Sequence, residues 1–595
     1  MSDSDKIEPE KLQDLETQAG KKRFIESDAG DGTKREEQYL HGAHLIGCFI
    51  AIFLCMFLTA LDQTIVATIL TTVGDKFHAF GQISWLISGF LLTMGAFIQM
   101  FGKLSIIFGR KYTMLVAIVI FELGSLICAV APNMNVLIGG RVVAGMGASG
   151  IQGLSFVIVS EVVPIEKRPI GMAIMSCVFA FASVLGPLVG GAFTTHVSWR
   201  WCFYVNLPIG AVAFAFLSWA FNPPRPKINF IEELKKFDYF GAFLLVSGWI
   251  LLLIALTFGA NEYAWDSPAV IATFIIAGSI MIGFVVWNLF FSKNQLFATE
   301  IIVVPQIMAS VLAITGIFAF SMTSLSYISI YFQVVLGYSA LGCGIHLLPL
   351  TLSVVVSSLV AGFTIQKFRY IKPFCLASAI LAPISGGLIM LFGLERDNGK
   401  QVGFLIIAGV SVGLLIQPSL ISSQIKAPKT PGSTIMVTTF YSFSRAIGSA
   451  LGTALGNVIY SVSLRNLFKS KLATETNPQI LEALQGQNIN QLVSDNTFIA
   501  ELNPVAQIFV KTQILHAIRK VYWLALAFAF VGSISTLFIT NKRLPQVSGR
   551  SDTEKEEKEE ERTEEPENGP SGEEIEEKQQ ETKAQAVEMT ESTSS

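Results

Sequence analysis

Long apolar runs separated by short polar segments recur along most of the chain. A helix needs about 20 apolar residues to cross the hydrocarbon core of a bilayer. Fourteen runs are long enough. The predicted spans are 44–70, 83–101, 112–131, 136–160, 170–195, 202–221, 240–259, 268–291, 309–334, 343–365, 372–393, 402–424, 434–461 and 520–540. Because backbone groups in lipid must be satisfied within the segment, these runs predict an all-α polytopic membrane protein.

The order of the runs predicts how the chain is divided. Six spans, then two, then six indicate two six-helix bundles joined by an inserted pair. The expected parts are a bundle over 43–221, an inserted two-span region over 222–300 and a bundle over 301–545. The second bundle includes a polar outer loop over 462–519 with some helical periodicity. Polar, aromatic-poor tails over 1–42 and 546–595 are predicted to be disordered.

The positions of lysine and arginine predict the orientation. With the N-terminus inside, the inner loops hold 17 of these residues and the short outer loops hold 4. Cytoplasmic loops of membrane proteins carry this excess. Both termini are therefore expected in the cytoplasm.

Composition supports the membrane assignment. Hydrophobic residues make up 51% of the chain and charged residues only 15%, against about 25% charged in soluble proteins. The tail from residue 551 holds 17 acidic and 5 basic residues, so the body is basic. A basic body with apolar spans is typical of cytoplasmic loops rather than a nucleic-acid site. The lipid bilayer is an expected partner and nucleic acid is not, and a monomer is expected.

Four ionisable side chains lie deep inside the predicted spans: Asp62, Glu122, Arg141 and Arg445. Each costs roughly 2.5–3.5 kcal/mol at a helix centre, so such residues usually face a cavity or a partner. By depth, Asp62 and Arg141 both fall in the outer third and can meet if their spans are neighbours. We interpret Asp62 or Glu122 as the proton carrier and Arg141 as the group that tunes proton release. A structural salt bridge is the alternative.

The loop after the second span, residues 102–111, reads GKLSIIFGRK. Its glycines allow a tight turn, and its bases lie at helix ends. This resembles the G-x-x-x-D-x-x-G-R-K signature of the major facilitator superfamily, with Ile106 in place of the aspartate. The resemblance implies a charge lock between bundles that is weaker here or built differently. The expected conformational residues are Gly102, Lys103, Gly109, Arg110 and Lys111.

Two further motifs resemble the same superfamily. Residues 137–147, LIGGRVVAGMG, resemble a motif whose membrane-embedded arginine is associated with proton transfer, and Arg141 is the matching residue. Residues 186–191, GPLVGG, resemble the antiporter motif G-P-x-x-G-G. The proline removes a backbone bond and the glycines permit a bend and close contact. A merely kinked packing helix is the alternative for Gly186, Pro187, Gly190 and Gly191.

Residues 61–66, LDQTIV, and 199–210, WRWCFYVNLPIG, resemble signatures of the fourteen-span drug:proton antiporters. Residues 121–125 and 258–265 resemble fungal members, which include azole and dye exporters and vacuolar basic amino acid transporters. The resemblance covers about residues 43–545. It implies a major facilitator fold and proton-driven export of small, cationic or amphipathic compounds.

Alternatives for function stay open. Vacuolar uptake of basic amino acids would use the same antiport chemistry at the vacuolar membrane instead of the plasma membrane. A transporter-like sensor would signal through the acidic tail. No phosphate-binding loop or metal-binding motif is present, so no cofactor and no enzymatic activity are expected. Candidate cavity residues are the polar residues on apolar spans, for which helix–helix hydrogen bonding is an equal alternative: Gln63, Gln99, Gln417, Gln424 and Arg445.

Overall fold

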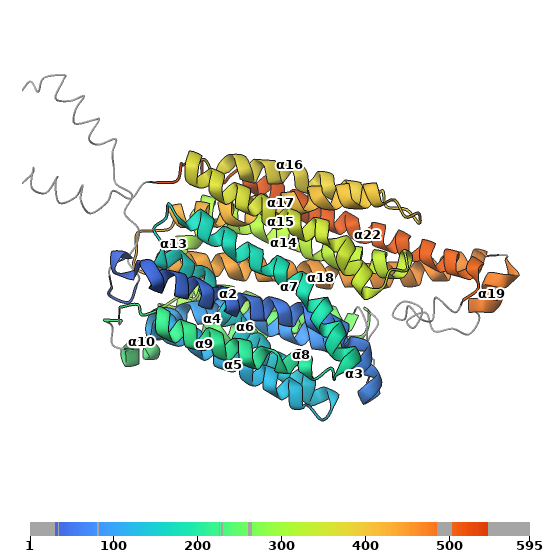
Figure 1. The fold of residues 1–595 in the computed structure, drawn as a ribbon, viewed down its shortest axis with the longest axis horizontal. Helices are drawn as coiled ribbons and strands as arrows, with labels where there is room; N and C mark the ends of the chain where they lie inside the picture. The colour runs from blue at the N-terminus through green and yellow to red at the C-terminus, as the bar shows by residue number, and fades with distance from the viewer. Residues whose placement is uncertain are drawn as a thin grey trace, which may run out of the picture. The chain divides into compact units, whose positions relative to one another are not determined.

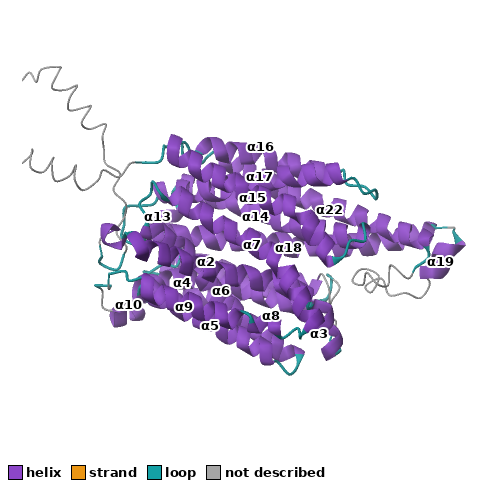
Figure 2. Cartoon of the chain, viewed as in Figure 1, coloured by secondary structure: helices purple, strands orange, loops and turns teal. Residues whose placement is uncertain are grey.

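The computed structural model describes residues 30–545 except 34, 80–81, 225, 228–229, 260–264, 476 and 485–501. Regular structure in this part of the chain is helical, with no strand (Figure 2). Most of the two predicted tails, including the acidic segment after residue 550, lies outside the described residues.

The first bundle is built from long helices that pack in pairs: α5 with α6, α4 with α6, and α2 with both α7 and α9 (Figure 1). Its last span runs from Trp201 to Ala220 and is interrupted only at Val205, whose backbone is itself helical. The helices are α2 (Gly42–Ile65), α4 (Ser84–Phe108), α5 (Arg110–Val130), α6 (Met134–Val162), α7 (Arg168–His196), α8 (Trp201–Tyr204) and α9 (Asn206–Ala220).

The second bundle repeats this organisation. Here α14 packs on α18 and α22, and α17 packs on α15 and α16. The helices are α14 (Pro305–Ile330), continued by the π-helical turn η6 (Tyr331–Val335), α15 (Ala340–Phe368), α16 (Lys372–Ile389), α17 (Asn398–Ile425), α18 (Ser433–Thr474) and α22 (Pro504–Thr536).

The inserted pair lies at the edge of the two bundles. Helix α11 (Tyr239–Thr257) packs on α4 and α18, one from each bundle, and so bridges them. Helix α12 (Pro268–Val286) packs on α11 and exposes apolar side chains such as Ile275 and Ile282. A helix with such a surface is suited to contact lipid.

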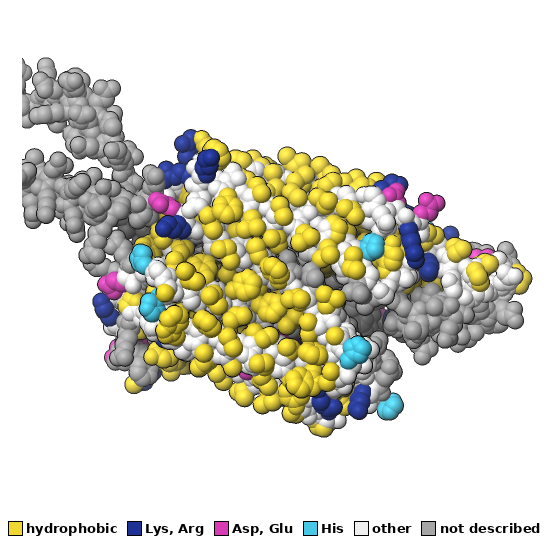
Figure 3. All heavy atoms as spheres, viewed as in Figure 1, with side chains coloured by type: hydrophobic (Ala, Val, Ile, Leu, Met, Phe, Trp, Pro, Cys, Tyr) yellow, Lys and Arg dark blue, Asp and Glu magenta, His cyan; other side chains and the backbone are white. Residues whose placement is uncertain are grey.

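Thirteen helices in the described residues are long and apolar enough to cross a membrane. Helix α7, with 29 residues, is the remaining long helix. Figure 3 shows hydrophobic side chains over the middle of one face, with most lysines and arginines toward its ends. This distribution matches a hydrocarbon band between two polar interfaces.

The two ends of the molecule are named here by their segments. The tail face carries residues 30–33, 35–41, 426–432 and 537–545, and the loop face carries residues 131–133, 197–200 and 390–397. Two segments differ from expectation. Residues 30–40, predicted to be disordered, include the short 3-10 helix η1 (Arg35–Gln38), and Leu40 N donates to the Val162 carbonyl. Asp31 in this segment is buried and pairs with Arg110 of the first bundle. This contact ties the segment to the bundle.

The second difference concerns the outer loop 462–519, where some helical periodicity was expected and both flanking helices extend well beyond the predicted spans. Helix α18 runs on to Thr474, and α22 already begins at Pro504, where Asn503 caps it by accepting from Ala506 N at 2.7 Å. The rings of Phe468 and Phe509 lie 6.3 Å apart, so the two extensions pack on each other. Hydropathy predicts where lipid ends, and a helix can continue into water beyond that point.

Candidate functional site

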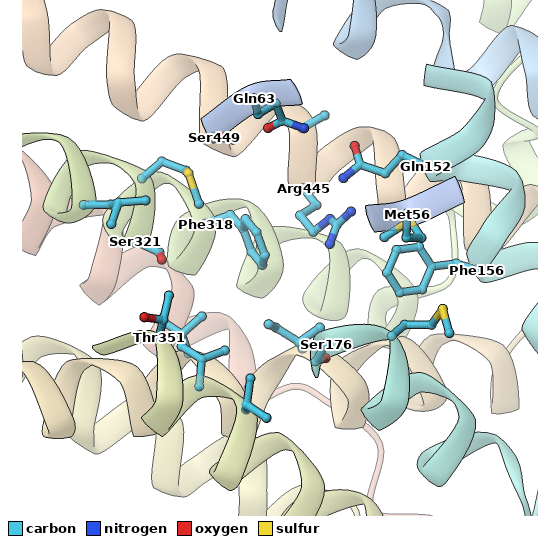
Figure 4. Close-up of a pocket in the computed structure, with 18 of the residues that line it drawn as sticks. Met56, Gln63, Gln152, Phe156, Ser176, Phe318, Ser321, Thr351, Arg445 and Ser449 are labelled. Atoms are coloured by element: carbon cyan, nitrogen blue, oxygen red, sulfur yellow. The ribbon is translucent and has the colours of Figure 1, made fainter. Parts of the chain in front are cut away.

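A cavity lies between the two bundles, at mid-length of the helices (Figure 4). Its lining comes from α2, α4, α6 and α7 of the first bundle and from α14, α15, α17 and α18 of the second. The empty space is about 1020 Å³, solvent at its open side included. Most of its lining is apolar with a few polar groups, which is the usual composition of a small-molecule site.

Two of the sequence-predicted cavity residues line this cavity, Gln63 from α2 and Arg445 from α18. The Gln63 amide nitrogen donates to the Thr59 carbonyl at 3.1 Å, one helical turn before it. Arg445 lies 12 residues after the start of α18, which is about 18 Å at 1.5 Å per residue. This places its Cα near the middle of a hydrocarbon core about 30 Å thick.

The other three predicted cavity residues are buried in helix contacts. The Gln99 amide donates to the Leu296 carbonyl at 2.8 Å. Gln417 is 2.6 Å from the Ser358 hydroxyl. Gln424 donates to Thr438 at 2.9 Å. At these three positions the glutamine makes hydrogen bonds within the helix packing and does not line the cavity. This is the alternative that the sequence left open.

A fully buried ion pair joins the two predicted charges of the outer third. Arg141 Nη1 lies 2.5 Å from Asp62 Oδ2, and both side chains are at most 2% exposed. Arg141 Nε also donates to the Leu86 carbonyl at 3.0 Å, and its guanidinium lies 4.2 Å from the centre of the Phe90 ring. The Asn206 amide donates to the other Asp62 oxygen at 3.3 Å. Asp62 is next in sequence to Gln63, which lines the cavity. The ion pair and the cavity are therefore joined through α2.

Glu122 has a different environment. Both of its carboxylate oxygens are buried and have no hydrogen-bond partner among the described residues. Its side chain lies against Gly210 of α9, where a Cβ would collide with it. A carboxylate without a donor is costly to bury while it is charged.

The motif at residues 102–111 forms the turn between α4 and α5. Gly109 ends one helix and begins the next with φ 84° and ψ 151°, a conformation that side chains with a Cβ rarely adopt. At Gly102, a Cβ would lie 2.5 Å from Thr439 Cγ2 of α18, so the two bundles touch here. Lys103 donates to Asn294 at 2.9 Å, and Lys111 donates to the Ser218 carbonyl at 2.6 Å.

Arg110 is the centre of a buried charged group at the tail face. Its Nη2 lies 2.8 Å from Glu161 Oε1 at the end of α6, and its Nη1 pairs with Asp31 of the N-terminal segment. Ile106, at the position of the usual motif aspartate, packs instead against an apolar cluster that includes Ile301 and Met436. The tail face thus combines an ionic group inside one bundle with apolar contact between bundles.

The GPLVGG motif brings α7 against α2. A Cβ at Gly186 would lie 2.7 Å from Thr64 Cβ, and one at Gly190 would lie 2.9 Å from Ile65 Cγ1. At Gly191, a Cβ would point into open space, with no neighbouring side chain among the described residues within 4 Å. Pro187 lies in the same helix. Two glycines of the motif are therefore required for close packing, and the third is not.

Sequence reasoning missed several residues of this site. Gln152 and Phe156 of α6 line the cavity and follow Arg141 on the same helix at intervals that keep them toward the interior. Asn206, within the motif entering the sixth span, was a detectable polar residue in an apolar context. Glu161 gave no such signal because it lies at the boundary of a predicted span. Asp31 gave none because it lies in a predicted tail.

Comparisons with known proteins agree with this geometry. The family model of the Major Facilitator Superfamily matches residues 52–453. Vacuolar basic amino acid transporter 5 of Saccharomyces cerevisiae is 31% identical, covering 87% of this chain and 94% of that protein. Azole resistance protein 1 of the same yeast is 32% identical, covering 89% and 93%. The MFS-type efflux pump MFS1 of Arthroderma benhamiae is 35% identical, covering 73% and 84%.

Solved structures show the same fold at low sequence identity. The major facilitator proton:xylose symporter XylE is 14% identical with a TM-score of 0.51, covering 84% of this chain and 98% of that chain. A bacterial homologue of the human lysosomal transporter Spinster, in an inward-facing conformation, is 15% identical with a TM-score of 0.51 and the same coverage.

Proposed function

Because the chain belongs to the major facilitator superfamily, we propose that it is a proton-coupled exporter of small amphipathic molecules. The observation that carries this proposal is the cavity between the bundles. One of its lining residues, Gln63, is next in sequence to Asp62 of the buried Asp62–Arg141 pair. Substrate would bind between the bundles and be exposed alternately as one bundle rocks on the other.

The tail face is placed in the cytoplasm in this proposal, because its loops carry the excess of lysine and arginine. Between the cavity and the tail face the bundles are in contact: Arg168 donates to Gln424 at 3.3 Å, and Gly102 meets Thr439. The structure then corresponds to a state closed on the cytoplasmic side. Export requires this contact to separate so that substrate can enter, and to form again before release.

Proton coupling is assigned to Asp62 and Glu122. When Asp62 is charged it holds Arg141, and a proton on Asp62 would remove that attraction and free the arginine for its other contacts. Glu122 would hold a second proton on the neighbouring helix α5. Proton binding and release would then change how α2, α5 and α6 pack on one another. Because α2 and α6 line the cavity, the shape of the cavity would change with them.

Uptake of basic amino acids into the vacuole is the second candidate, supported by similarity to vacuolar basic amino acid transporter 5 along most of both chains. A lysine or arginine substrate would need a carboxylate in the cavity. Among the described residues that line it, none is aspartate or glutamate, and Arg445 is cationic. The cavity therefore favours drug-like compounds, in line with the similarity to the azole resistance protein and the efflux pump.

The test is transport by purified protein in proteoliposomes with an imposed pH gradient, screened with amphipathic dyes and with basic amino acids. Wild-type protein should move a dye only when the gradient is present. Asp62→Asn and Glu122→Gln should each reduce gradient-driven flux by tenfold or more on the scale of a lost proton-transfer group. Asp266→Asn, at an exposed loop residue, is the matched control. Full pH-driven flux in both Asp62→Asn and Glu122→Gln would contradict the proposed coupling.

A further inference from the structure

The cavity between the bundles carries one formal charge among its described lining residues, and that charge is positive. The other polar side chains in the lining are neutral amides and hydroxyls, such as Gln63, Gln152 and Thr351. Asp62 is 0% exposed and already pairs with Arg141. The charge offered to a bound molecule is thus that of Arg445.

Arg445 has no anionic partner among the described residues. Its guanidinium is held between two rings, with the centre of Phe156 at 4.9 Å and that of Phe318 at 5.1 Å. One of its terminal nitrogens, Nη2, is buried and has no hydrogen-bond acceptor. Figure 4 shows the guanidinium among Gln152, Phe156 and Phe318 at the cavity. Aromatic faces attract a cation but leave its N–H donors unsatisfied.

The contrast with Arg141 shows what Arg445 lacks. Arg141 also lies over a ring, that of Phe90, but it has a carboxylate at 2.5 Å and a backbone carbonyl at 3.0 Å as well. Tyr441, one turn before Arg445, cannot fill this role. Its hydroxyl is engaged with the Ile416 carbonyl at 2.7 Å and with Ser419 at 2.6 Å.

A planar guanidinium with free donors binds carboxylates and related oxyanions, often through two parallel hydrogen bonds. The rest of the lining is apolar and adaptable, with the thioethers of Met56, Met94, Met175 and Met322. Unbranched methionine side chains fit ligands of different shape. The site thus pairs one anion-binding group with a flexible apolar surface.

We propose that the cavity selects amphipathic organic anions, with the anionic group of the substrate held by Arg445 and its apolar body against the methionines and phenylalanines. This inference rests on the proposed export function and names its substrate class. Cationic amphipaths, which the sequence resemblance favoured, would meet like charge at the centre of the site.

Equilibrium binding to purified protein tests the inference with two dyes of one scaffold. Fluorescein is an anionic xanthene and rhodamine 6G is a cationic xanthene ester. Fluorescence anisotropy should show tighter binding of fluorescein by the wild type. Arg445→Gln should weaken fluorescein binding by about ten- to a hundredfold, the effect of losing a charge-assisted pair. Arg445→Lys should retain part of the affinity, and Arg543→Gln, at an exposed tail-face residue, should leave it unchanged.

The inference is overturned if the wild type binds rhodamine 6G more tightly, if it does not bind fluorescein, or if Arg445→Gln binds fluorescein as the wild type does. The wild-type comparison decides even where a variant fails to fold. Flux separates the two proposals: gradient-driven export of rhodamine 6G but not fluorescein would keep the exporter and remove the anion preference. A lack of gradient-driven flux for either dye would instead remove the exporter.

Discussion

At the scale of single residues, two arginines in the membrane interior are stabilised in different ways. A lone arginine at the centre of a membrane helix costs roughly 2.5–3.5 kcal/mol. Arg141 offsets this cost with the Asp62 carboxylate, the Leu86 carbonyl and the Phe90 ring. Arg445 has two rings and an unsatisfied nitrogen. In the proposed mechanism, Arg141 responds to a proton on Asp62 and Arg445 responds to a bound ligand.

The Asp62–Arg141 pair allows a double-mutant cycle. Arg141→Met leaves a charged carboxylate in an apolar interior, and breaking a buried pair in this way typically costs about 3–5 kcal/mol. The double variant Asp62→Asn with Arg141→Met should be less destabilised than the sum of the two single variants, because no lone charge remains. Thermal unfolding of the purified proteins measures this. Additive losses would mean that the two side chains do not interact.

Sequence alone predicted that this pair can form if the two spans are neighbours. The rise of a helix is fixed, so counting residues from each span end places Asp62 and Arg141 at the same depth. The same reasoning could not separate Gln63, at the cavity, from Gln99, which bonds the Leu296 carbonyl. Which way a polar side chain faces depends on which helices pack beside it. Hydropathy predicts where the helices are but not which of them are neighbours.

At the scale of elements, glycines set how closely helices approach. Helix α7 touches α2 through Gly186 and Gly190, and α4 touches α18 through Gly102. Small residues at such contacts let backbones come close and gain dispersion energy. The sequence motif predicted a bend or a close contact in α7, and close contact is what Gly186 makes. Which of its three glycines would be in contact depended on the rotation of α7, which the motif does not encode.

Two substitutions in one motif test this contact. Gly186→Ala should lower the thermal unfolding temperature, because its methyl group would overlap Thr64 and push α7 from α2. Gly191→Ala should be neutral or slightly stabilising, since the space there is open and alanine favours a helix by up to about 1 kcal/mol. Equal effects of the two changes would refute the packing role, and scanning fluorimetry in detergent is sufficient to see the difference.

At the scale of the whole molecule, contact between the bundles near the tail face closes the cavity on that side. Ile106, where the superfamily signature has aspartate, belongs to the apolar cluster with Ile301 and Met436. The sequence predicted that the charge lock would be weaker or built differently. In the structure the arginine of the motif, Arg110, pairs with Glu161 and with Asp31 of the N-terminal segment. The second partner was beyond sequence reasoning, because an acidic residue in a polar tail is normally solvated.

Restoring the signature residue should weaken this closure. Ile106→Asp places a carboxylate at a partly buried position against the apolar cluster, where separation of the bundles would let more water reach it. Ser449, which lines the cavity, can be changed to cysteine as a reporter for a membrane-impermeant maleimide. Labelling from the tail face should rise severalfold with Ile106→Asp and stay at the starting level with Ile106→Val. Unchanged labelling in both variants would show that Ile106 does not hold the bundles together.

The extended ends of α18 and α22 have a practical consequence. Helix α18 has 42 residues, about 60 Å at 1.5 Å per residue, or roughly twice the thickness of the hydrocarbon core. Together with α19 (Pro478–Leu484), which packs on α22, these ends project from the loop face (Figure 1). An antibody fragment raised against this projection would give electron microscopy a rigid fiducial outside the detergent belt, and would leave the cavity unobstructed.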